Sequence, residues 1–257
     1  MYLKDNFTAY KTIVIKEILR FSRIWVQTII PPAITMGLYF IIFGQLIGSQ
    51  LNDINNYSYM DYIVPGLIIM SIITNSYANV VSSFYGTKFH HHIEELLVSP
   101  IANLTIIAGY VSGGVARGLI VGLVVTLVSL FFTRIPIDSY VTTLFIALLT
   151  AILFSLAGLI NAIFANSFDD ISIVPTFVLT PMTYLGGVFY SIEMLPEFWQ
   201  NVSLFNPVLY MVNGFRMGML GVSDASLASA IVIIVGFISL LTAISLWLLH
   251  KGVGIKK

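Results

Sequence analysis

The chain has 257 residues, of which 58% are hydrophobic and only 9% are charged. Soluble globular proteins carry about 25% charged residues, so this composition excludes a water-soluble protein and indicates a chain embedded in lipid. Twelve basic and twelve acidic residues give a formal net charge of zero and there is no cysteine, so neither attraction to nucleic acid through bulk charge nor a disulfide is expected.

Residues 1–25 predict an amphipathic helix. Apolar side chains recur every three or four residues, and most of the lysines and arginines of the segment lie off this stripe. The pattern favours a cytoplasmic helix lying among the headgroups of an anionic leaflet, and an ordinary helix packed against the protein is the alternative. The stripe consists of Leu3, Phe7, Tyr10, Val14, Ile18, Phe21 and Trp25.

Six apolar segments follow, each of roughly 20 residues or more, which is enough to cross a hydrocarbon layer of about 30 Å. No cleavable signal peptide is apparent, and no polar interval is long enough to fold alone, so a single all-α integral membrane domain over 1–257 is predicted. An even number of spans places both termini on one side. Nine of the twelve basic residues fall on that side, which predicts cytoplasmic termini. The predicted spans cover about 24–47, 62–85, 106–132, 141–165, 171–190 and 227–249.

The span at 62–85 is unusually polar in its middle, and the span at 106–132 contains an arginine. Lipid contact with polar side chains would be costly, so this face of the second span is expected to meet other helices or a water-filled path. Asn75, Asn79 and Ser82 are candidates for lining such a path. For Arg117 two interpretations remain open: pairing inside the bundle or at the headgroups, and contact with an anionic substrate.

A polar segment over about 88–99 predicts a short amphipathic helix that Pro100 ends. His91, His92, Glu94 and Glu95 turn toward water, opposite an apolar face that includes Leu97. Such a helix either lies on the headgroups or presents a charged face to another protein. No metal site is expected, because consecutive helical histidines point about 100° apart and cannot converge on one ion.

The region 191–226 is too apolar for a solvated loop. Pro196 and Pro207 divide it into pieces that are too short to cross the membrane, which predicts re-entrant or interfacial helices on the outer side. The aromatic residues in this region suit either anchoring among headgroups or an exit gate for an amphipathic substrate.

Motifs for catalysis are missing from the sequence. There is no phosphate-binding loop, no nucleophile elbow and no His-Glu-x-x-His motif, so the chain is expected to be a transport subunit rather than an enzyme. An ion- or proton-driven secondary transporter is the alternative function. That class needs acidic residues near the membrane midplane, and none of the twelve acids lies inside a predicted span.

Four stretches resemble the permease subunit of a bacterial type-2 ABC exporter, the small stand-alone kind of the inner membrane. The resemblance covers essentially the whole chain. The stretches are the run from Ile93 to Pro100, Phe168-Asp169-Asp170 before Pro175 and Pro181, the run from Leu185 to Tyr190, and Asn206-Pro207 through Gly214-Phe215-Arg216.

The resemblance implies a function and partners. The chain would export a polysaccharide, lipid or drug by alternating access, as a homodimer in the lipid of the bacterial inner membrane, with no nucleic-acid partner. The segment 88–99 would be the coupling helix, docked on one of two separate ATPase subunits. Those subunits would hold ATP and Mg, and no cofactor is expected in this chain. The implied contact residues are His91, His92, Glu94, Glu95 and Leu97, with Asp169 and Asp170 as second contacts.

Overall fold

The computed structural model describes residues 2–50, 53–54, 57–134 and 137–254, and the described chain is helical, as predicted. No strand occurs among these residues, apart from one isolated bridge between Ile54 and Tyr57. Lys256 and Lys257, counted among the cytoplasmic basic residues, and the side chain of Leu3 lie outside the described part of the chain.

Five helices of the described chain are long and apolar enough to cross a membrane. They coincide with five of the six predicted spans, which confirms a multi-pass helical architecture. Continuous helix forms because lipid leaves backbone amides no other hydrogen-bonding partner. The five are α2 (Trp25–Tyr39) continued by the π-helical η1 (Phe40–Ile47), α3 (Tyr59–Phe89), α5 (Asn103–Ser129), α6 (Tyr140–Phe164) and α11 (Leu227–Lys251).

The predicted span at 171–190 takes a shorter form. It consists of α7 (Asp170–Val174), the π-helical η3 (Pro175–Leu179) and α8 (Thr180–Tyr184), three pieces of five residues each. Fifteen helical residues rise about 22 Å, less than the hydrocarbon thickness of about 30 Å. Pro175 and Pro181 supply no backbone donor, and the last helical piece ends at Tyr184, three residues before Gly187, whose φ is +73°. This segment is therefore not among the five long helices.

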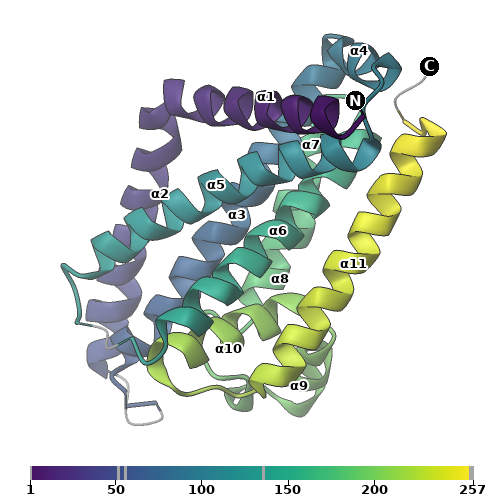
Figure 1. Ribbon diagram of the computed structural model, residues 1–257. Helices are drawn as coiled ribbons and strands as arrows, with labels where there is room; N and C mark the ends of the chain where they lie inside the picture. The colour runs from purple at the N-terminus through teal and green to yellow at the C-terminus, as the bar shows by residue number, and fades with distance from the viewer. Residues whose placement is uncertain (1, 51–52, 55–56, 135–136, 255–257) are drawn as a thin grey trace.

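Helix α3 is the centre of the bundle. In its most apolar stretch 83% of residues are buried, against 17% for α2 and 11% for α11. It packs against α5, α6 and α10, and Figure 1 shows it behind α5 and α6. Helices α2 and α11 lie at the periphery and keep broad apolar faces exposed.

Helix α1 (Tyr2–Arg23) lies across one end of the bundle and packs against α5 before the chain turns at Ile24 into α2 (Figure 1). Its buried face consists of Ile13, Glu17 and Phe21. The predicted stripe is therefore only partly the packed one, since Phe7, Ile18 and Trp25 are exposed. The packed face agrees with the alternative interpretation of α1, and a location among headgroups stays a prediction.

Glycines of α5 make room for its two neighbours. A Cβ on Gly113 would lie 2.5 Å from the Cβ of Glu17, so α1 could not approach so closely if any larger residue stood there. On another face of α5 a Cβ on Gly118 would collide with Ser76 of α3. Close packing of this kind is how small residues join helices in lipid.

The 3-10 turn η2 (Gly48–Gln50) ends the first long helix. The outer region folds as the 3-10 turn η4 (Ile192–Met194) followed by two short helices. Helix α9 (Glu197–Leu204) follows Pro196 and exposes Phe198 and Trp199. Helix α10 (Pro207–Leu220) begins with its proline at the first helical position and packs against α3, α6 and α11. It is therefore a buried short helix, while α9 lies at the surface.

Candidate functional site

The end of α3 forms a sharp joint with α4 (His92–Val98), so the helix predicted over 88–99 is divided in two. His91 adopts φ +60°, the left-handed conformation that commonly ends a helix and that residues other than glycine seldom adopt. Its backbone N–H donates to the carbonyl of Lys88 over 3.0 Å. At the other end of α4, Ser99 is extended, as expected of a residue before proline.

Helix α4 has one anchored and one free face. Ile93 is 1% exposed and fixes the helix to the core, and Leu97 is half-buried beside it. His91, His92, Glu94 and Glu95 are exposed, as predicted for a contact surface. The Nδ1 atom of His91 lies 3.0 Å from Oε1 of Glu94, so the joint and the first turn of α4 are held together. Acidic residues in a first turn also interact favourably with the helix dipole.

The turn between α6 and α7 lies directly beside this joint. The ring of Phe168 packs edge-on against Tyr85, with ring centres 4.9 Å apart, and at a tilt against Phe89, with ring centres 5.2 Å apart. Lys88 donates from Nζ to the carbonyls of Ile163 and Ala165, at 2.6 Å each, and so caps the C-terminal end of α6. The structure thus brings together the two predicted contact regions, and their binding to an ATPase stays a prediction.

Asp169 and Asp170 have different environments. Asp170 and Ser167 form the reciprocal bonds of a capping box: the carboxylate accepts from the Ser167 backbone at 3.2 Å, and the Asp170 backbone donates to the Ser167 hydroxyl at 3.1 Å. The N–H of Asn166, the Ser167 hydroxyl and the nearby charge of Lys88 hold the pKa of Asp170 below its ordinary value of 3.8. Asp169 is exposed and free to meet a partner.

We predict that Asp170→Ala lowers the melting temperature by a few degrees at neutral pH, because the turn loses its cap. The pKa of Asp170 is depressed in the folded protein, so its stabilisation is present above pH 3.8 and is lost as the pH falls through the lowered pKa. Thermal unfolding in detergent measures both effects. Asp169→Ala is the control and should unfold like the wild type; equal losses in both variants would contradict the assignment.

The predicted path residues lie in a polar network of α1 and α3 around Arg20 and in a neighbouring contact between α3 and α5. Nη2 of Arg20 donates to the carbonyl and to Oδ1 of Asn79, both at 2.8 Å, and Nη1 lies 3.4 Å from the Ser82 hydroxyl. One turn away on α3, Asn75 accepts a weak bond of 3.5 Å from Arg117. In this conformation the four predicted residues face neighbouring helices of the same chain. Their role in lining a path stays a prediction.

Sequence reasoning missed the acidic member of this network. Glu17 has no exposed surface; it accepts a 2.6 Å bond from Ser83, and its other oxygen lies 3.4 Å from Nη2 of Arg20. The spacing of Glu17 and Arg20 by three residues is compatible with a helical ion pair. The sequence alone does not show that this pair lies on the packed face.

Arg216 of α10 is fully buried at the opposite end of the bundle. Its guanidinium lies 4.0 Å above the ring of Tyr62, and Nη2 donates to the carbonyl of Gly187 at 2.7 Å. Asp224 accepts from the Ile192 backbone at 3.2 Å and lies 3.5 Å from the Tyr62 hydroxyl. These contacts connect α3 and α10 to Gly187 and Ile192, which precede α9, and to Asp224 in the loop after α10.

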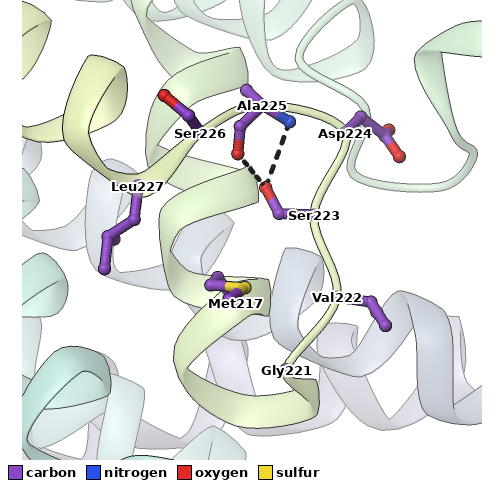
Figure 2. A pocket seen from close by; sticks show the side chains of 8 residues that line it. All are labelled: Met217, Gly221, Val222, Ser223, Asp224, Ala225, Ser226 and Leu227. Atoms are coloured by element: carbon purple, nitrogen blue, oxygen red, sulfur yellow. Dashed lines mark hydrogen bonds between the residues drawn. The ribbon is translucent and has the colours of Figure 1, made fainter.

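A hollow of about 680 Å³ lies at the loop between α10 and α11. Figure 2 shows Ser223 bonded to the backbone of Ala225, while the Asp224 carboxylate points away from Ser223. The polar groups around this hollow are thus engaged in shaping the loop. The lining residues are Met217, Gly221, Val222, Ser223, Asp224, Ala225, Ser226 and Leu227.

Comparisons with known proteins agree with the architecture. The chain is 58% identical over 250 residues to the inner membrane transport permease YadH of Escherichia coli strain K12, covering 97% of this chain and 98% of that protein. It is 22% identical over 219 residues to nodulation protein J of Rhizobium meliloti, covering 85% and 79% of the two chains. Residues 8–220 match the family described as ABC-2 type transporter. This chain therefore belongs to the ABC-2 type transporter family, as a small inner-membrane transport permease rather than an enzyme.

Proposed function

We propose that this permease is the membrane half of an ATP-driven exporter, moving an amphipathic glycan, lipid or drug-type substrate out of the cytoplasm. The observation that carries the proposal is α4, a short rigid helix with one face anchored by Ile93 and the other free and charged. ABC transporter permeases depend on a separate ATPase, and a free charged face at a helix joint is suited to contact one.

The joint can pass a displacement of α4 into the bundle. Helix α4 follows directly on α3, and α3 is a single helix of 31 residues at the centre of the core. The adjacent Phe168 and Lys88 contacts would carry the same displacement to α6 and α7. A packed interior shifts between discrete arrangements rather than deforming continuously. A small displacement of α4 would therefore switch the bundle between inward-facing and outward-facing states.

The proposed assembly contains two copies of this chain and two ATPase subunits, each binding ATP and Mg. The exposed apolar faces of α2 and α11 would meet lipid or the second copy. The segment from α7 to α8 would serve as a short sixth span, with both termini in the cytoplasm. In support, Figure 1 places α1, α4, α7 and the end of α11 at one end of the bundle, with α9 and α10 at the other.

An ion- or proton-driven carrier is the competing function. Within the five long helices as described, the acidic residue is Asp61, in the first turn of α3. Glu17 is buried, but it belongs to α1 and is engaged by Ser83 and Arg20. Neither is placed like a midplane coupling carboxylate. Substrate movement by purified chain in vesicles, driven by a sodium or proton gradient without ATP, would support the carrier and overturn the exporter.

Charge reversal on α4 tests the exporter. The double variant Glu94→Lys and Glu95→Lys should reduce by at least about tenfold the amount of ATPase subunit that co-purifies with the tagged permease, since repulsion replaces complementarity at the contact. The matched control, Glu193→Lys with Glu197→Lys, changes the net charge equally at exposed positions on the opposite end. Equal co-purification with both variants would remove α4 from the interface.

A further inference from the structure

A second hollow, of about 630 Å³, lies on α1 where this helix approaches the start of α2. Helix α1 lies across the end of the bundle, and α2 descends from it as the first long apolar helix (Figure 1). The hollow is thus at the depth where lipid phosphates lie if the long helices span the bilayer. Its lining residues are Thr12, Ile15, Lys16, Leu19, Arg20, Arg23 and Ile24.

The hollow carries excess positive charge. Lys16, Arg20 and Arg23 line it, and no acidic residue does. Within the described chain the one ion pair of these cations is that between Arg20 and the inward-facing Glu17. The ammonium group of Lys16 lies near neutral groups, 3.4 Å from the Thr87 hydroxyl and 5.6 Å from the centre of the Tyr110 ring. An anion from outside the chain would complete this arrangement.

The remaining lining is apolar and exposed. Ile15, Leu19 and Ile24 leave 46%, 48% and 41% of their surfaces open. A free phosphate ion would gain nothing from these side chains. An acyl chain would cover them while its phosphate met the cations, so the hollow fits an amphipathic anion better than a small one.

We propose that this hollow is a discrete binding site for the phosphate headgroup of an anionic phospholipid. Arg20 is shared between this site and the network inside the bundle, where it binds Asn79. A bound lipid would therefore hold α1 against α3 and stabilise the folded permease. The proposal requires neither a transported substrate nor an ATPase, so it stands or fails independently of the exporter function.

The test uses the purified full chain in neutral detergent. Phosphatidylglycerol added to the micelles should raise the melting temperature in a saturable way, whereas phosphatidylcholine and inorganic phosphate should not. Each cation near an anionic lipid contributes about fivefold in affinity, so Lys16→Gln with Arg23→Gln should weaken the phosphatidylglycerol response about 25-fold. Arg20 is left intact in this variant because it also supports the fold.

The control variant is Lys4→Gln with Lys11→Gln, which removes the same charge from exposed positions of α1 outside the hollow. It should bind phosphatidylglycerol like the wild type. Equal weakening in both double variants would show diffuse attraction and overturn a discrete site. Equal stabilisation by inorganic phosphate would show an anion site that does not select lipid, and no response to phosphatidylglycerol would show no site at all.

Discussion

Replacement of Glu17 by alanine is expected to lower the free energy of unfolding by about 3 kcal/mol. The carboxylate is fully buried between α1 and α3, and it accepts from Ser83 while pairing with Arg20. Its removal leaves the Ser83 hydroxyl without an acceptor and Arg20 without a counter-charge. Loss of one partner of a buried pair costs about 3–5 kcal/mol, and the lower end applies because 28% of the Arg20 side chain is exposed.

Thermal unfolding in detergent measures the loss. Glu17→Gln keeps the shape and an acceptor for Ser83, so its melting temperature should lie between those of the alanine variant and the wild type. Glu95→Ala removes an exposed carboxylate and should change the free energy of unfolding by less than about 0.5 kcal/mol. If Glu17→Ala and Glu95→Ala have the same melting temperature, the Glu17 carboxylate does not hold α1 in place.

The long helices were predictable because apolar runs of this length have few stable alternatives in lipid. The span predicted at 141–165 is α6 over Tyr140–Phe164, nearly the same segment. The helical bounds within the segment 171–190 were harder to predict, since hydropathy does not show where backbone geometry ends a helix. Its helical part ends at Tyr184, before the turn that contains the left-handed Gly187, and so comprises fifteen residues.

The candidate site was predictable where it depends on local periodicity and not where it depends on packing. The exposure of Glu94 and Glu95 follows from helical spacing within a short segment. The capping role of Asp170 could also have been found, because Ser167 stands three residues before it. Burial of Glu17 depends on Gly113 and Ser83 of two other helices, which no local pattern contains.

Replacement of Arg216 by alanine is expected to lower the free energy of unfolding by about 4 kcal/mol, the largest effect predicted for this chain. Arg216 has no exposed surface, so the shorter side chain leaves a cavity. It also leaves the carbonyl of Gly187 without its donor and the ring of Tyr62 without the guanidinium stacked above it. The segment at Gly187 then loses a direct hydrogen bond to α10.

The lysine variant separates charge from shape at this position. A lysine keeps the charge but has no planar fork, so it cannot reach the Gly187 carbonyl while stacking on Tyr62, and Arg216→Lys should still lose about 2 kcal/mol. Arg134→Ala removes an exposed arginine and should stay within about 0.5 kcal/mol of the wild type in the same detergent unfolding assay. Full recovery by lysine would mean that charge alone matters at position 216. If Arg216→Ala and Arg134→Ala unfold at the same temperature, other contacts hold the outer segments in place. The bond from the Ile192 backbone to Asp224 is the next of these contacts to test.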